Sequence, residues 1–313
     1  MPAWGGNARL EGESLYVVEA DEYDQAFLAL SPTVAVVNNV EADHLECYGS
    51  LESLEAAFAT FASRAGTRLI GVDDPGAARL AARLGPGTLR FGIAPEADFR
   101  LSQVQQGAEG TRAQFSLPGR GAVEIRLRVP GLHNLRNATA ALAVVQALGG
   151  SVEAALEALG DFTGVGRRFE RLGEAGGVTL VDDYAHHPTE VAATIEAARQ
   201  AFPGRRLVAV FQPHLFSRTQ AHGAEMGRAL AAADVAVVTE IYAARERPVP
   251  GVSGVLVAEA ARAAGGEVHF APERSAVADV VRGLVGPGDV LLTLGAGDIT
   301  RLGPELVAEW QAA

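Results

Sequence analysis

Five short apolar runs recur through the second half of the chain, each separated from the next by enough residues for a helix. The runs cover residues 179–181, 206–211, 235–239, 268–270 and 290–294. Parallel strands are joined by crossovers of a dozen or more residues, which are usually helices. The spacing therefore predicts an α/β fold whose second part is a Rossmann-like, doubly wound parallel sheet.

The first half begins with the same strand-and-helix alternation and then changes. Apolar runs at residues 15–18, 34–37 and 68–72 predict buried strands, and Leu54, Ala57, Phe58 and Phe61 follow the spacing of one helical face. Short alternating runs between glycine-rich turns come next, at residues 99–104, 113–117 and 123–129. We expect a partial parallel sheet that carries an antiparallel flap.

A boundary is indicated where helical patterns give way to glycines. Residues 135–148 and 152–159 have helical patterns, and Gly160, Gly164 and Gly166 follow closely. We therefore predict one domain over residues 1–165 and a second over residues 166–313.

Composition excludes several functions. The 313 residues have a net charge of -12, which disfavours a duplex nucleic-acid surface, and all 26 basic residues are arginine. Without lysine there is no GxxxxGK[ST] phosphate loop and no Schiff-base lysine. Cys47 is the single cysteine, so an internal disulfide is impossible. No apolar stretch reaches the roughly 20 residues of a membrane span, and we expect a cytoplasmic protein without a membrane partner.

Acidic residues follow the first two predicted strands of the chain. They are Glu19, Asp21, Glu22 and Asp24 after the first strand, and Asp43 with His44 after the second. Ligands bind beyond the carboxyl ends of strands in open α/β sheets, so these groups could converge on Mg²⁺. The alternative is a solvated acidic turn with a histidine that caps a helix.

Two amides stand three residues apart at a predicted helix start. Asn134 and Asn137 could present a donor and an acceptor to an adenine edge, or both could cap backbone groups.

In the second half, polar groups follow two strands. Asp182, Asp183, Tyr184, His186 and His187 come after the first of them and could bind sugar hydroxyls or a metal. We favour hydrogen bonding, because adjacent histidines on a loop usually diverge.

His214 and Arg218 follow the next strand, where the guanidinium could clamp a carboxylate with two hydrogen bonds or could lie on the surface. Neither Gly164–Gly166 nor Gly295–Gly297 has the third glycine of a dinucleotide fingerprint, and no GxSxG elbow is present. A dehydrogenase and a serine hydrolase are therefore disfavoured.

Taken together, these motifs resemble the Mur ligases over nearly the whole chain, and most closely the members that add alanine. The segments that carry the resemblance are Asn7–Arg9, Glu19–Glu22, Asn39–His44, Pro130–Asn134 with Asn137, Gly166–Phe169, Asp182–Glu190, Phe211–Thr219 and Leu294–Gly297.

The resemblance implies a ligase of peptidoglycan precursor synthesis. ATP would phosphorylate the lactyl carboxylate of UDP-N-acetylmuramate, and the amine of L-alanine would then displace phosphate. Glu19 and His44 would bind Mg²⁺, Asn134 and Asn137 would contact adenine, and Asp182 or Asp183 would hold the ribose. Arg168 would approach the ATP phosphates. The amino-acid pocket would be lined by Tyr184, His187, His214 and Arg218. The catalytic groups would be His44, Arg168, His187, His214 and Arg218.

Two positions depart from the alanine-adding pattern, since Tyr23 replaces the usual serine and Leu215 replaces a frequent arginine. The segment around Tyr23 also resembles a muropeptide-recycling ligase, which joins a tripeptide to the same nucleotide sugar. We favour alanine because Gln212, His214 and Arg218 follow the alanine-adding pattern.

The family's N-terminal UDP-binding domain and its lysine-containing phosphate loop have no counterpart in this sequence. We therefore expect an incomplete portion of the enzyme that is inactive alone. It could be completed by a separately encoded N-terminal half, or it could be a non-catalytic binding fragment.

Overall fold

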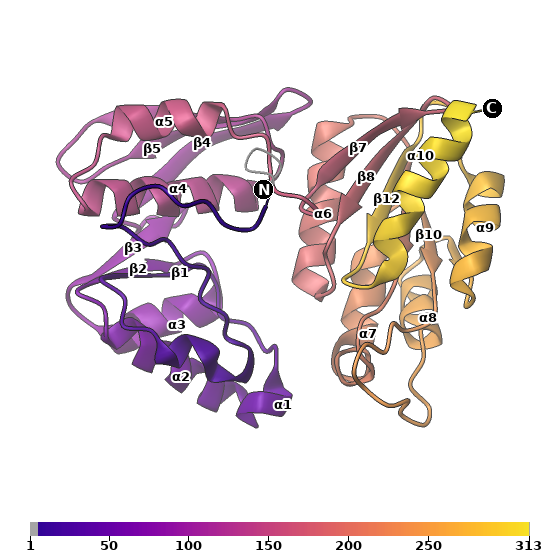
Figure 1. Ribbon diagram of the computed structural model, residues 1–313, viewed down its shortest axis with the longest axis horizontal. Coiled ribbons are helices and arrows are strands. Elements are labelled where there is room, and N and C mark those ends of the chain that lie inside the picture. The colour runs from indigo at the N-terminus through magenta and orange to yellow at the C-terminus, as the bar shows by residue number, and fades with distance from the viewer. Residues whose placement is uncertain (1–5, 313) are drawn as a thin grey trace.

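The computed structural model describes residues 6–312 and contains two six-stranded sheets, one in each half of the molecule (Figure 1). We call residues 6–160 the first half and residues 170–312 the second half. The strands of the first half are β1 (Val34–Val37), β2 (Thr67–Gly71), β3 (Thr88–Gly92), β4 (Phe99–Gly107), β5 (Gly110–Ser116) and β6 (Ala122–Leu127). Its helices are η2 (Tyr23–Ala29), α1 (Leu45–Tyr48), α2 (Leu51–Ser63), α3 (Pro75–Leu84), α4 (Leu132–Ala147) and α5 (Val152–Gly160).

The first sheet has the order β1-β2-β3-β4-β5-β6. Strands β1 to β4 are parallel, whereas β5 and β6 are antiparallel to their neighbours, which confirms the predicted flap. Helices α4 and α5 pack on one face of this sheet, and α2 and α3 pack on the other (Figure 1).

The sequence pattern did not indicate strand β3 or helix α3. The start of α3 nevertheless has a local signal, because Asp74 accepts a hydrogen bond from the backbone of Ala77 at 2.7 Å and Pro75 occupies the first turn.

The predicted strand at residues 15–18 is wrong. This segment is extended but unpaired, and the side chains of Tyr16 and Val17 are 77% and 91% exposed. An apolar run becomes a strand only where a neighbour supplies hydrogen-bond partners. Among residues 6–312, the only strand paired with β1 is β2, so the acidic cluster after residue 18 follows an open segment instead of a sheet.

The second half is built around the predicted parallel strands. Its strands are β7 (Glu170–Ala175), β8 (Val178–Asp183), β9 (Leu207–Phe211), β10 (Val235–Val238), β11 (Val268–Phe270) and β12 (Val290–Leu294). Its helices are α6 (Pro188–Ala201), α7 (Phe216–Leu230), α8 (Val255–Ala263), η3 (Arg274–Ala276), α9 (Val277–Leu284), η4 (Asp298–Arg301) and α10 (Leu302–Ala312).

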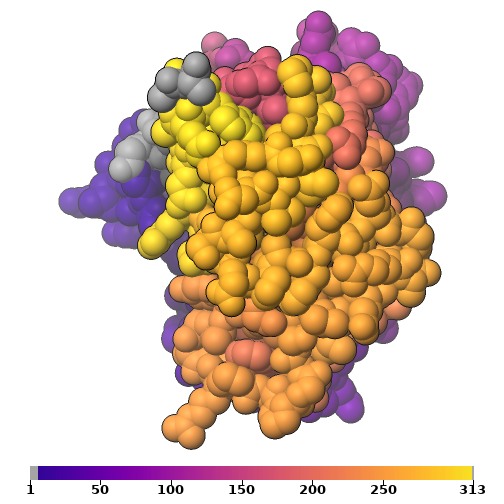
Figure 2. Space-filling model, turned by 90° about the vertical axis from the view of Figure 1, so that its right-hand side faces the viewer, coloured from indigo at the N-terminus to yellow at the C-terminus, as the bar shows by residue number. Residues whose placement is uncertain are grey.

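The strand order of this sheet is β11-β10-β9-β12-β8-β7, with β7 as an antiparallel edge. Helices α6, α7 and α8 cover one face and α9 and α10 cover the other, as expected of a doubly wound sheet. The surface turned away from the first half is formed mainly by the orange and yellow C-terminal segments (Figure 2). Because β8, β9 and β12 lie side by side, the loops that follow them meet at one edge.

Segment 161–169 joins the halves, and we retain a domain division at residue 165 as a proposal. None of the helices within residues 6–312 is long and apolar enough to cross a membrane.

We expect Gly227→Ala to destabilise the second half. A Cβ atom at this position of α7 would lie 2.5 Å from the carbonyl oxygen of Val257 and 2.6 Å from Cβ of Ala260, both in α8. Overpacking costs about 1–3 kcal/mol, more than the ~1 kcal/mol that alanine gains over glycine in a helix. Urea unfolding should therefore show a lower midpoint.

The matched control is Gly223→Ala, one turn earlier in α7. Its Cβ would meet no atom closer than 3.6 Å, so this substitution should raise stability by about 0.5–1 kcal/mol. Stabilisation by both substitutions would show that the α7–α8 contact is looser than described.

Candidate active site

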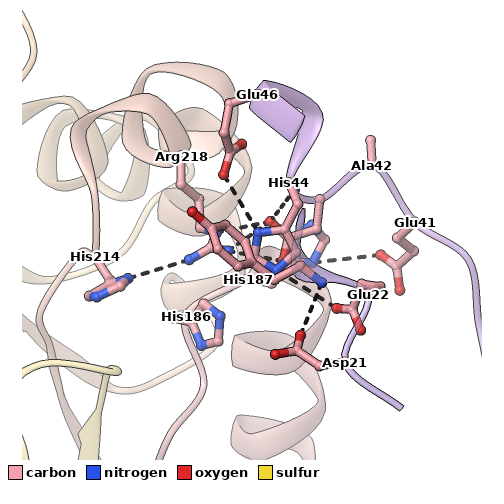
Figure 3. A network of polar contacts seen from close by, with 12 residues as sticks. Asp21, Glu22, Glu41, Ala42, His44, Glu46, His186, His187, His214 and Arg218 are labelled. Carbon is pink, nitrogen blue, oxygen red and sulfur yellow. Dashed lines mark hydrogen bonds and ion pairs between the residues drawn. The ribbon is translucent and has the colours of Figure 1, made fainter. Parts of the chain in front are cut away.

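An ion pair between the halves lies at the centre of the candidate site. Arg218 lies on the first turn of α7, close to His214 (Figure 3). It donates from Nη2 to both carboxylate oxygens of Asp43, at 2.7 and 3.0 Å, and from Nε at 3.3 Å. The Arg218 side chain is only 5% exposed. Burial raises the pKa of Asp43, but the charge and hydrogen bonds of Arg218 outweigh it and hold this pKa below its usual value. The Arg218 guanidinium thus holds a carboxylate of the first half. Its contact with a substrate carboxylate stays a prediction.

Three histidines lie at the carboxyl ends of β8 and β9. The rings of His186 and His214 are 6.0 Å apart, and His187 Nδ1 is 3.6 Å from Glu41 of the first half. Burial lowers the pKa of all three, and His186, Arg218 and Arg245 help to lower that of His214 to about 4. Neutral imidazoles at neutral pH can accept or donate a proton.

Hydrogen bonds orient two of these imidazoles. His186 Nδ1 lies 2.8 Å from the carbonyl oxygen of Tyr184, so Nδ1 carries the proton and Nε2 is the acceptor. Arg218 Nη1 is 3.4 Å from Nδ1 of His214, which makes that nitrogen the acceptor. His187 Nε2 is buried without a hydrogen-bond partner, a position open to a ligand.

His44 sits among acidic groups but not beside Glu19. Its Nε2 lies 3.7 Å from Glu22 and 3.7 Å from Asp43, while Nδ1 is buried and makes no hydrogen bond. Glu19 is exposed, and no group of three His, Cys, Asp or Glu residues within the described chain could hold a metal ion. The residues present do not form a metal cage, and Glu19 with His44 as Mg²⁺ ligands stays a prediction.

The two predicted adenine contacts lie at and near the start of α4. Asn134 Nδ2 donates to the carbonyl oxygen of Pro130 at 2.7 Å, and Asn137 Oδ1 accepts from Asn38 Nδ2 at 3.3 Å. Each amide therefore keeps one polar atom for a ligand. Nearby, His133 is half-buried, and this burial together with Arg168 and Arg136 lowers its pKa.

Asp182 and Asp183 already have partners within the chain. Asp182 accepts hydrogen bonds from the hydroxyls of Thr293 and Thr300, and Asp183 accepts from the backbone of Phe169 and Ala185 at 2.7 and 2.8 Å. Burial raises the pKa of both carboxyls, that of Asp183 to about 6. Each carboxyl, although buried, retains acceptor capacity beyond these two hydrogen bonds.

Arg167 and Arg168 both lie over the ring of Tyr184, with guanidinium carbons 4.6 and 5.2 Å from its centroid. Arg167 also donates to the carbonyl oxygen of Gly295 at 2.8 Å. Arg168 makes only a 3.4 Å contact with Glu190 and is half exposed, so it has the greater freedom to reach a ligand.

Backbone strain occurs beside the histidines. Leu215 is 3% exposed and has φ 69° and ψ 138°, a conformation that a residue with a Cβ rarely adopts. Its N–H donates to the carbonyl oxygen of Tyr242 at 3.0 Å, which holds it there. Such strain is typical of functional sites.

Sequence reasoning assigned no role to three residues at this site. His222 is four residues after Arg218 on α7, a spacing that could have revealed it, and its Nε2 lies 3.1 Å from the carbonyl oxygen of Ala42. Glu190 accepts from the backbone of His186 and His187 as the third residue of a capping box. Arg245 lies in an irregular loop without any local signal.

Family comparison agrees with this fold. The Mur ligase middle domain matches residues 6–145, and the Mur ligase glutamate ligase domain matches residues 167–297. The fold is that of a Mur ligase, and the chain belongs to that family.

Among its relatives are UDP-N-acetylmuramate–L-alanine ligases. Those of Salinibacter ruber and Kineococcus radiotolerans are 44% and 49% identical over 305 and 308 residues, which is 96% of this chain in both cases. The chain spans 64% and 65% of their lengths. The crystal structure of UDP-N-acetylmuramate–alanine ligase from Thermotoga maritima is 29% identical, with a TM-score of 0.78, and the match covers 94% of this chain and 63% of that one.

We expect Asp43→Asn to destabilise the contact between the halves by about 1–3 kcal/mol, because it leaves the buried Arg218 guanidinium without its counter-charge. Urea unfolding measures the loss. The matched control is Asp161→Asn. Asp161 pairs with Arg128 at 3.1 Å, and their side chains are 76% and 64% exposed, so this pair should contribute under ~1 kcal/mol. Equal effects would mean that Asp43 and Arg218 are solvated in solution.

His214 should titrate near pH 4. Its pKa is lowered in the folded protein from an unfolded value of about 6.5. The neutral ring therefore contributes stability that is complete above pH 6.5 and is lost as the pH falls from 6.5 towards 4. NMR titration of the imidazole, assigned with His214→Gln, measures the midpoint. A midpoint near 6.5 would contradict the buried, positively charged surroundings.

Proposed function

We propose that this chain provides the nucleotide- and amino-acid-binding portion of a ligase that joins L-alanine to UDP-N-acetylmuramate with ATP. The similarity to two alanine ligases over 96% of the chain supports this choice of substrates. The alternative, the tripeptide of a muropeptide-recycling enzyme, is supported by the segment around Tyr23 alone. The relatives named for this reaction are about half as long again as this chain. We therefore propose the activity for the complete assembly, which is this chain together with a polypeptide that supplies the N-terminal portion present in the relatives.

One observation carries the proposal: neutral imidazoles and arginines from the second half meet an acidic loop of the first half. His187 follows β8 and contacts Glu41, whereas His214 follows β9, which β12 separates from β8 in the sheet. Arg218 contacts His214 and pairs with Asp43. Amide-bond formation requires a base for the amine proton and cations for the phosphoryl charge. Both kinds of group are present at one place.

The proposed reaction has two steps. A carboxylate oxygen of the sugar nucleotide attacks the γ-phosphorus of ATP, and the bond to ADP breaks. The alanine nitrogen then attacks the carbonyl carbon, the carbon–oxygen bond to phosphate breaks, and the amine loses a proton. We assign that proton to His187 or His214, since both imidazoles are neutral at physiological pH.

Arg218 is suited to hold the alanine carboxylate without releasing Asp43. Its Nε and Nη2 face Asp43, while its Nη1 has only the 3.4 Å contact with His214. We propose that Nη1 binds the substrate carboxylate beside Tyr184, and that Arg168 turns from Glu190 towards the ATP phosphates. Asn134 and Asn137 would hold adenine, and Asp182 or Asp183 the ribose.

Phosphate binding within this sequence depends on arginine and backbone amides, because the sequence has no lysine. We retain Glu19 and His44 as proposed Mg²⁺ ligands and derive no step through the metal.

The decisive experiment measures ADP release in the presence of Mg²⁺, UDP-N-acetylmuramate and L-alanine. The purified chain is assayed alone and with a polypeptide that supplies the N-terminal portion present in the relatives. We expect ADP release only in the mixture, and only when both substrates are added. Activity of the chain alone would show that arginine suffices for phosphate binding.

Two controls separate the alternatives. A tripeptide in place of L-alanine tests the recycling reaction, and ADP release with the tripeptide only would replace the proposed substrate. His214→Gln, which removes a proposed base, should lower kcat at least 10-fold in the active mixture. No ADP release in any mixture would support a non-catalytic binding fragment.

A further inference from the structure

A cation–π contact joins the halves at a second place. The guanidinium carbon of Arg245, in the loop between β10 and α8, lies 4.5 Å from the ring centroid of Tyr23 in η2. That distance is within the ~6 Å range of attraction between a cation and an aromatic face. The Tyr23 ring in turn meets the ring of His44 edge-to-face, with centroids 5.1 Å apart and planes at 73°. The three side chains form a continuous row of contacts from the second half to the loop that carries Asp43.

The loop around Arg245 is anchored on both sides. Before it, the N–H of Tyr242 donates to the carbonyl oxygen of Pro213 at 2.8 Å. After it, Glu246 accepts from the backbone and hydroxyl of Ser217, at 2.9 and 2.5 Å, at the start of α7. The preceding residue, Ala244, has φ 48°. The backbone at Arg245 is therefore held against the same helix start that presents Arg218.

The turn that carries Tyr23 is also constrained. Its own N–H donates to Asp21 at 3.0 Å, and the Tyr48 hydroxyl donates to the carbonyl oxygen of Glu22 at 2.5 Å. The next two residues, Asp24 and Gln25, both have left-handed φ values, 52° and 59°. Two consecutive residues of this kind persist only where the surroundings enforce them. The ring is thus presented to the second half by a strained turn.

We propose that Tyr23 and Arg245 form a clasp between the halves that positions the loop 41–48 under Arg218. Both are positioning residues, since neither is among the groups assigned to substrate, nucleotide or metal. The clasp lies beside the Arg218–Asp43 ion pair. The ion pair mainly fixes the distance between the two halves, whereas the contact with the aromatic ring also fixes their relative orientation. This inference stands whether or not the complete assembly has the proposed activity.

Hydrogen exchange measured by mass spectrometry on the full chain tests the clasp. Arg245→Gln should increase amide exchange in residues 41–48 and 21–27 about two- to five-fold, the range expected for loss of an exposed cation–π contact. These residues lie in the first half, whereas the substitution lies in the second. Tyr23→Ala should produce the same increase in residues 41–48, and the double variant should add little to either single change.

Matched variants separate stacking from general effects. Arg247→Gln removes the same charge from the same loop, where no contact of Arg247 is described, and should leave both segments unchanged. Tyr23→Phe keeps the ring and Arg245→Lys keeps a cation, so both should restore most of the protection. Unchanged exchange in Arg245→Gln, or equal effects of the Arg245 and Arg247 substitutions, would overturn the proposal.

A spectroscopic measurement reports on the contact itself. The chain contains five tyrosines, and after incorporation of fluorotyrosine the ¹⁹F signal of Tyr23 is identified by its loss in Tyr23→Phe. Arg245→Gln should shift this signal and leave the other four in place, which also shows that the variant is folded. A Tyr23 signal that does not respond to Arg245→Gln would mean that the guanidinium does not lie over the ring in solution.

Discussion

The pairing of Arg218 with Asp43 is the constraint on which the site depends, because it fixes one half against the other. A guanidinium whose side chain is 5% exposed cannot remain unpaired, and its partner comes from the loop after β1. This requirement places Glu41 beside His187 and Ala42 beside His222. The pair therefore helps to keep the site residues of the two halves together.

Burial keeps the three imidazoles neutral, and the same guanidinium adds to this effect at His186 and His214. Burial is the largest cause of the lowered pKa of His214, and His186 and Arg218 add to it. In water these imidazoles would be partly charged near neutral pH, whereas here they are neutral. A cluster of three uncharged bases can lie close together, while three imidazolium ions would repel one another. Burial and the fixed positive charge therefore produce the arrangement required for proton transfer to an imidazole.

Much of the fold followed from sequence patterns, since the five parallel strands of the second half and the flap of the first were predicted from apolar spacing. The strand at residues 15–18 failed because an apolar run does not reveal whether a neighbouring strand exists. His214 and Arg218 could be proposed from their place after β9. Their partner Asp43 is 175 residues from Arg218, and Arg245 lies in an irregular loop, so no local pattern indicated either contact.

Strained backbone gathers where the halves meet. Asp24, Gln25, His44, Leu215 and Ala244 all have positive φ without being glycine. Holding a residue in such a conformation costs of order 1–3 kcal/mol. Each residue would relax towards an ordinary conformation if its neighbours released it. Tyr23 precedes Asp24, Asp43 precedes His44 and Arg245 follows Ala244, and these three neighbours make contacts between the halves. The strain is therefore offset by the same interactions that assemble the site, so loosening one contact allows its neighbours to relax as well.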